Sequence, residues 1–120
     1  MQNHVNKCIA RTIGLSNFSI AGIQELLPHE NDVPISCNQV EVHPWFPNND
    51  LIAFGKEHRI LTTCYSPFGG QKASGESLRK DATVLKLAEK NSMDVGQLLQ
   101  SWAVQRGTLP LGKSSTAGRH

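Results

Sequence analysis

Four short groups of polar side chains stand out in this 120-residue sequence, because their hydroxyl, amide, aromatic and ammonium groups are suited to holding a polar ligand. The groups are Ser16-Asn17, Gln39 to His43, Tyr65-Ser66 and Lys113-Ser114. Taken singly, Lys113 and Arg119 have the character of solvated surface charges. Their close spacing, with Ser114 between them, instead favours a phosphate site, because two cations and hydroxyl donors suit a phosphate dianion.

Two other sets of residues could carry chemistry. His43 and Glu41 lie close enough in sequence to suggest a metal site or an acid–base pair. Cys37 and Cys64 lie in apolar runs and are expected to be packed thiols. With Cys8 they make an odd number of cysteines without CxxC spacing, which favours a reduced, cytoplasmic compartment. No metal site is predicted.

The polar groups follow runs of residues that have the pattern of β-strands. Strands are expected over residues 10–15, 33–42, 60–65 and 109–111, and helices over 19–27, 51–58, 81–90 and 92–107. Ser19 and Ser92 are the expected N-caps of the first and last helices, and residues 71–80 are expected to form an exposed loop. Single helical crossovers between strands predict a parallel sheet, in which ligands bind at the carboxyl ends of the strands. Four such strands predict half of a barrel or a small open sheet.

The composition disfavours nucleic-acid-binding and membrane-spanning proteins. The chain carries a formal net charge of +2, and its basic residues are scattered rather than clustered among aromatic side chains, which disfavours a nucleic-acid partner. No apolar run approaches the roughly 18 to 20 residues that a membrane-spanning helix needs, so no membrane partner is expected. We therefore expect one soluble α/β segment covering residues 1–120.

Five sequence strings in this order resemble the aldo-keto reductases. They are Ile13 to Phe18, Asn38 to Pro44, Tyr65 to Gly69, Trp102 to Gly107, and Gly112 to Ser114 with Arg119. The resemblance covers nearly the whole chain. It implies the C-terminal half of a (β/α)₈ TIM barrel, with about four parallel strands and intervening helices, as a partial NADP-dependent oxidoreductase domain.

The resemblance also implies roles for individual residues toward NADP(H). Ser16, Asn17 and Gln39 would hydrogen-bond the nicotinamide carboxamide, and Tyr65 would stack on the nicotinamide ring. The loop that holds Ser66, Phe68 and Gly70 would approach the pyrophosphate. The expected clamp for the adenosine 2′-phosphate consists of Lys113, Ser114, Ser115, Thr116 and Arg119. The chain departs from the family pattern at Gly112, where the family has proline, and at Phe68, where it has leucine.

The implied activity is the reduction of aldehydes or ketones to alcohols by hydride transfer from NADPH. The family's catalytic tyrosine, lysine, histidine and aspartate precede the segment matched here, and Tyr65 takes the stacking position, so no catalytic residue is predicted in this chain. We expect a fragment that acts on a small carbonyl or alcohol substrate only in the complete enzyme. The alternative is a non-catalytic nucleotide-binding or interaction half-barrel that self-associates through its open sheet edges.

Overall fold

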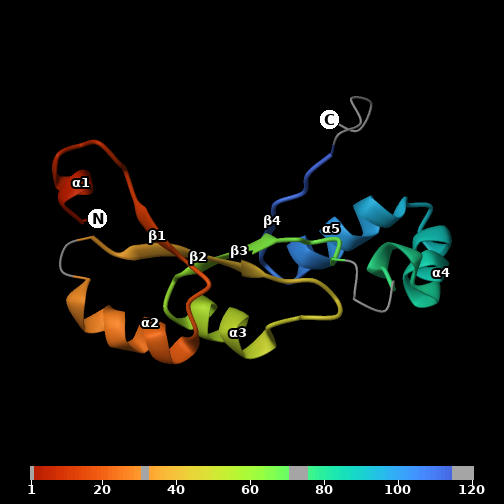
Figure 1. Ribbon diagram of the computed structural model, residues 1–120, viewed down its shortest axis with the longest axis horizontal. Coiled ribbons are helices and arrows are strands. Elements are labelled where there is room, and N and C mark those ends of the chain that lie inside the picture. Colours follow the sequence, from red (N-terminus) through yellow and green to blue (C-terminus); the bar gives the residue numbers. More distant parts are fainter. Residues whose placement is uncertain (1, 31–32, 71–75, 115–120) are drawn as a thin grey trace. The chain divides into compact units, whose positions relative to one another are not determined.

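The computed structural model describes residues 2–30, 33–70 and 76–114, in which helices follow strands along the chain (Figure 1). The elements are α1 (Gln2–Asn6), β1 (Ile13–Ser16), α2 (Ile20–Leu26), η1 (Leu27–His29), β2 (Ile35–Glu41), α3 (Asn49–Glu57), β3 (Leu61–Tyr65), η2 (Leu78–Lys80), α4 (Ala82–Lys90), α5 (Val95–Gln105) and β4 (Leu109–Pro110). The four strands are parallel and hydrogen-bonded in the order β1-β2-β3-β4, as helical crossovers between strands predict. The crossover from β3 to β4 holds two α-helices, α4 and α5, rather than one.

The chain divides into two compact units. The first consists of residues 1–40 and 48–63, and the second of residues 41–47 and 64–120. Each unit has its own cluster of buried apolar side chains.

In the first unit, α2 and α3 cover strands of the sheet (Figure 1). The core consists of Ile23 from α2, Ile35 from β2 and Ile60 just before β3, with side chains of α3 packed against them. Ser19 caps α2 as predicted, since its side chain accepts a hydrogen bond of 3.2 Å from the Gly22 amide. Pro28 lies in the short 3₁₀ helix η1 that follows α2, where proline ends the α-helical pattern.

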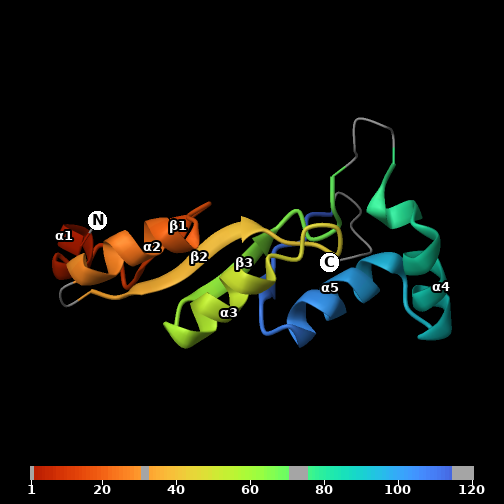
Figure 2. The same ribbon diagram turned by 90° about the horizontal axis from the view of Figure 1, so that it is seen from below.

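In the second unit, the neighbouring helices α4 and α5 (Figure 2) enclose a core of Leu78, Val84 and Leu99. Leu78 is 1% exposed, so the prediction of an exposed loop over residues 71–80 was wrong at this position. Because the residues around Leu78 in the sequence are polar, no apolar pattern indicated that it is buried. Leu78 is the first residue of η2 and attaches this helix to the core. Residues 71–75 lie outside the described part of the chain.

The start of α5 differs from the prediction. Asp94 is the N-cap, not Ser92, and it forms a capping box in which its side chain accepts from the Gln97 amide at 2.9 Å. The Gln97 side chain in turn accepts from the Asp94 amide at 3.0 Å. Ser92 has a φ of 54° and lies in the turn between the helices.

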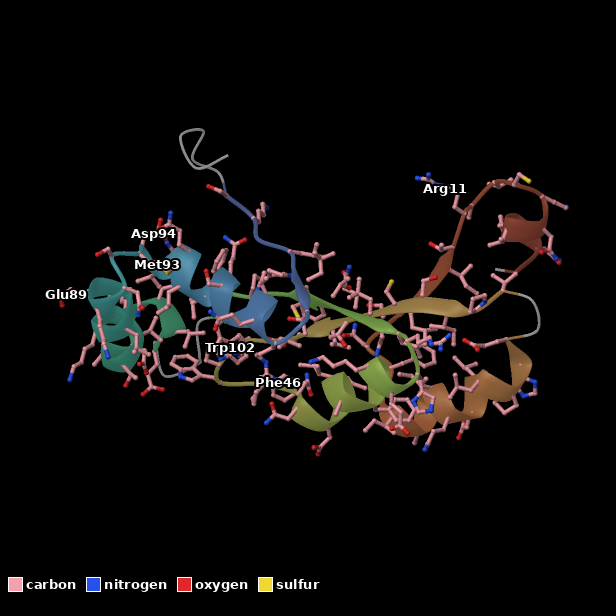
Figure 3. The ribbon with its side chains drawn as sticks, turned by 180° about the vertical axis from the view of Figure 1, so that it is seen from behind. Arg11, Phe46, Glu89, Met93, Asp94 and Trp102 are labelled. Atoms are coloured by element: carbon pink, nitrogen blue, oxygen red, sulfur yellow. The ribbon has the colours of Figure 1, made fainter. Side chains whose placement is uncertain are left out.

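The loop before α3 is fastened to α5 within the second unit. The Arg106 guanidinium donates a 2.7 Å hydrogen bond to the Pro47 carbonyl and lies 4.5 Å from the centre of the Trp102 ring. Figure 3 shows Trp102 and Phe46, the residue before Pro47, on this part of the molecule. No helix in the described ranges combines the length and apolar character needed to cross a membrane.

Candidate functional site

In the first unit, the carboxyl ends of β1 and β2 bring together the first group of predicted site residues. Ser16 pairs with Gln39 across the parallel strands. The Asn17 amide donates to the Gln39 carbonyl at 2.9 Å, and the Asn17 side chain donates to Ser16 Oγ at 3.3 Å. Asn17 has a φ of 59°, a left-handed conformation that asparagine tolerates better than most residues. The Ser16 and Asn17 side chains are exposed and Gln39 is partly buried, so this edge of the sheet presents hydroxyl and amide groups to a ligand.

Asn38, next to Gln39, has a structural role. Its side chain is 2% exposed, donates to the Phe18 carbonyl at 2.9 Å and accepts from the Phe18 amide at 3.4 Å. These two bonds hold the loop that carries Ser16 and Asn17 in place.

In the second unit, the loop after β3 carries the next group. Tyr65 is the last residue of β3, and a turn follows in which the Gly69 amide donates to the Ser66 carbonyl at 2.9 Å. Gly69 has a φ of 63°, and a Cβ there would lie 3.1 Å from Leu78 Cβ. Glycine is therefore favoured both by the backbone conformation and by the close approach to Leu78. This contact places the loop directly against η2.

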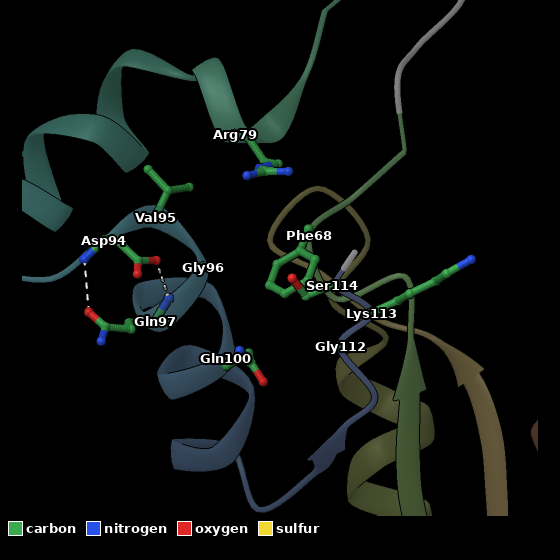
Figure 4. Close-up of a pocket in the computed structure, with 10 residues that line it drawn as sticks. All are labelled: Phe68, Arg79, Asp94, Val95, Gly96, Gln97, Gln100, Gly112, Lys113 and Ser114. Carbon is green, nitrogen blue, oxygen red and sulfur yellow. Dashed lines mark hydrogen bonds between the residues drawn. The ribbon is translucent and has the colours of Figure 1, made fainter. Parts of the chain in front are cut away.

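A pocket of about 690 Å³ lies in the second unit, where this loop meets η2, the first turns of α5 and the segment after β4 (Figure 4). Its size falls within the range of small-molecule and cofactor sites. Its lining residues are Phe68, Arg79, Asp94, Val95, Gly96, Gln97, Gln100, Gly112, Lys113 and Ser114. Three of the predicted cofactor-binding residues, Phe68, Lys113 and Ser114, therefore line one pocket.

The charges around the pocket favour an anion. Arg79 and Lys113 are exposed, and neither side chain has a hydrogen bond or ion pair with any other described residue. Asp94 is the acidic side chain of the lining, and its carboxylate is engaged with the Gln97 amide in the capping box. Two cations against one engaged carboxylate leave the pocket net positive.

The Phe68 ring fills the space above two glycines. A Cβ at Gly112 would lie 3.2 Å from Phe68 Cζ and 3.3 Å from Gln100 Oε1, and one at Gly96 would lie 3.8 Å from Phe68 Cε1. Phe68 and Gly112, the positions at which the resemblance leads us to expect leucine and proline, are thus neighbours in space. A side chain at position 112 would therefore press against the edge of the Phe68 ring.

Four predicted cofactor-binding residues remain: Gly70, Ser115, Thr116 and Arg119. Gly70 is exposed, and no atom of another residue lies within 4 Å of a Cβ built on it. Ser115, Thr116 and Arg119 lie outside the described residues, so the far end of the predicted clamp stays a prediction. Sequence reasoning missed Arg79, Gln97 and Gln100. The Asp94-x-x-Gln97 spacing of a capping box was the available signal for the start of α5, whereas nothing distinguishes Arg79 from a solvated charge.

His43 and Glu41 contact each other. His43 is 7% exposed, and its Nε2 lies 3.0 Å from Glu41 Oε1. In the described ranges, no group of three or more histidine, cysteine or acidic residues could hold a metal ion. Cys64 is fully buried, and this burial raises the pKa of its thiol above the ordinary value, against the opposing effects of a hydrogen bond with Thr108 and the Arg106 charge.

A family model described as "Aldo/keto reductase family" matches residues 2–119 of the chain. The chain belongs to the aldo/keto reductase family. It is 38% identical over 122 residues to the glycerol 2-dehydrogenase (NADP(+)) of Hypocrea jecorina, covering 99% of this chain and 38% of that protein. It is 43% identical over 106 residues to an aldehyde reductase of Saccharomyces cerevisiae, covering 87% of this chain and 33% of that one.

Solved structures of aldo/keto reductases have the same fold. The crystal structure of a Bombyx mori aldo-keto reductase in complex with NADP superposes with a TM-score of 0.87 at 33% identity, covering 99% of this chain and 40% of that one. An aldo/keto reductase from Brucella melitensis gives a TM-score of 0.85 at 31% identity, covering 98% of this chain and 43% of that one. These likenesses confirm the predicted fold class, the C-terminal half of a (β/α)₈ barrel. The chain spans less than half the length of the relatives that it matches.

Proposed function

We propose that this chain binds NADP(H) and that, as part of a complete aldo/keto reductase barrel, it serves the reduction of aldehydes or ketones to alcohols. The observation that carries the proposal is the positively charged pocket lined by Phe68, Lys113 and Ser114. An NADP-bound relative with the same fold and the name of the Hypocrea relative support this choice of cofactor.

The residues of the second unit fit the phosphate-bearing part of NADP(H). Lys113 would pair with the 2′-phosphate as a point charge, and Ser114 would donate its hydroxyl. The predicted partners Ser115, Thr116 and Arg119 would complete this clamp. The exposed loop around Ser66 and Gly70 would receive the pyrophosphate, because glycine has no Cβ and lets the phosphate oxygens approach the backbone closely.

The strand ends fit the nicotinamide part. The Ser16 and Asn17 side chains, with Gln39 beside them, offer the donors and acceptors that a carboxamide needs. Tyr65 would present its aromatic face to the nicotinamide ring and orient it. When bound, NADPH supplies the hydride that reduces the carbonyl carbon.

The proton donor for the reaction would come from outside this chain. We propose that its own residues bind and orient the cofactor and that the complete barrel, in the cytosol, contributes the catalytic side chains and the carbonyl substrate. Tyr65, the sole tyrosine, is assigned to stacking and does not also serve as the acid.

Binding of NADPH tests the proposal. The change in fluorescence of NADPH or NADH on addition of the chain gives the affinity for each nucleotide. Lys113→Met should weaken NADPH binding about ten-fold or more while leaving NADH binding unchanged. Lys86→Met is the matched control, because Lys86 is an exposed lysine on α4 that does not line the pocket. If the unaltered chain bound neither nucleotide, the proposal would be wrong. If it bound NADPH tightly and the longest native form of the protein still reduced no aldehyde, the non-catalytic binding module would be the correct function.

A further inference from the structure

Arg79 is a charged residue of the pocket that the proposed cofactor contacts leave unused. It belongs to η2 and lines the same pocket as Lys113. Its guanidinium has no hydrogen bond or ion pair with the described residues, although arginine at a ligand site normally engages an anion. Figure 4 shows Arg79 extending from η2 toward Phe68, with the Lys113 side chain starting beside that ring and pointing in a different direction. The two cations are therefore placed to bind different parts of one ligand.

The backbone of Arg79 is held beside the loop after β3. Its neighbour Leu78 is 1% exposed and anchors η2 in the core of the second unit. Leu78 also lies against Gly69, where a Cβ would come within 3.1 Å of Leu78 Cβ and 3.2 Å of Cδ2. The loop of Ser66 to Gly70 and the base of the Arg79 side chain thus form one packed structure.

The acidic residue that lines the pocket does not neutralise the Arg79 guanidinium. Lys113 and Arg79 are the cations of the pocket, and Asp94 is the acidic group of the lining. The Asp94 carboxylate accepts the Gln97 amide at 2.9 Å and serves as the helix cap. An incoming anion therefore meets an arginine that no described carboxylate neutralises.

We infer that Arg79 binds the pyrophosphate of the dinucleotide, which rests on the proposed NADP(H) function. The pyrophosphate carries two negative charges on oxygens that suit the fork of a guanidinium. Because NADP⁺ and NAD⁺ share this group, Arg79 strengthens binding of both nucleotides equally. Lys113, at the 2′-phosphate, distinguishes between them. The two cations of one pocket thus have separable effects, one on affinity and one on selectivity.

The experiment is calorimetric titration of the full chain and its variants with NADP⁺ and with NAD⁺. Arg79→Met should weaken both affinities by the same factor, about ten-fold or more. Arg79→Phe should weaken them equally, because phenylalanine keeps a flat side chain but lacks the positive charge that binds the pyrophosphate. Lys80→Met is the matched control, since Lys80 is an exposed cation of η2 that does not line the pocket. It should leave both affinities unchanged. Circular dichroism of each variant checks that the fold is retained.

The outcomes separate this inference from the proposed function. If the unaltered chain bound NADP⁺ and Arg79→Met bound it equally well, Arg79 would have no role while the proposed function stood. A loss confined to NADP⁺ would overturn the pyrophosphate assignment and place Arg79 at the 2′-phosphate. Recovery of binding in Arg79→Phe would also overturn it, because the side chain would then act by covering the base. If the unaltered chain bound neither nucleotide, the proposed function and this inference would both fail.

Discussion

Gly112 and Phe68 form a contact whose energy can be measured. A Cβ at position 112 would lie 3.2 Å from Phe68 Cζ and 3.3 Å from Gln100 Oε1. These separations are shorter than the roughly 3.5 to 4.0 Å at which carbon atoms pack best, so the ring would have to move by a few tenths of an ångström. Gly112→Ala should therefore destabilise the second unit, although Gly112 has no positive φ to forbid alanine.

The magnitude follows from two opposing effects. Inserting a methyl group into a packed site costs about 1 to 3 kcal/mol, and the lower end applies because Phe68 is only partly buried. Replacing glycine by alanine recovers about 0.4 to 1 kcal/mol through the unfolded chain. The difference is a net loss of about 0 to 0.6 kcal/mol for Gly112→Ala in the Phe68 background. We expect no loss with Phe68→Leu, because leucine lacks the Cζ atom. Gly70→Ala is the control, since no atom lies within 4 Å of the added Cβ.

Urea unfolding followed by tryptophan fluorescence measures these free energies, because Trp45 and Trp102 both belong to the second unit. The double variant should be more stable than the sum of the single effects predicts, by about 1 kcal/mol. Additivity of the two substitutions to within about 0.3 kcal/mol would refute the argument that the ring and the glycine compensate for each other.

Three further predictions concern the elements that support the pocket and the core beside it. Leu78→Ala should lower the free energy of unfolding by about 2 to 5 kcal/mol, measured in urea, because Leu78 is 1% exposed and anchors η2. Asp94→Ala should cost about 0.5 to 2 kcal/mol in the same assay through loss of the α5 cap, whereas Asp94→Asn should cost little, because asparagine also caps helices. Cys64 should resist alkylation in the folded chain while the exposed Cys8 reacts, as mass spectrometry of the labelled protein would show.

The raised pKa of Cys64 also gives stability a pH dependence with a definite sign. In the unfolded chain the thiol ionises above about pH 8.5, whereas in the folded chain it remains protonated to higher pH. The folded state then binds more protons, so stability falls as the pH rises above about 8.5 and until the folded pKa is passed. Cys64→Ala should remove this component of the pH dependence of the urea midpoint. If the urea midpoint of Cys64→Ala fell with pH as steeply as that of the unaltered chain, Cys64 would not be the source of this pH dependence.

Much of the fold could be predicted from local signals. Ser19 caps α2 and Gly107, with a φ of 75°, follows the end of α5, because capping and chain reversal depend on residues close in sequence. The predicted N-cap of α5 was wrong by two residues. Ser92 and Asp94 are both residue types that cap helices, and only the capping box with Gln97 decides between them. The burial of Leu78 was missed because its partners Val84 and Leu99 lie on other helices.

The sequence by itself determined the α/β class, the order of strands and helices, and the family to which the chain belongs. Those features follow from residue periodicity and from strings such as those around Ser16 and Lys113, which can be read without knowing what lies beside them. Only the tertiary structure decided that Phe68 lies over Gly112 and that Arg79 shares a pocket with Lys113. These residues are far apart in sequence, and their contacts exist because helix and strand packing brings separate segments together, which no local pattern encodes.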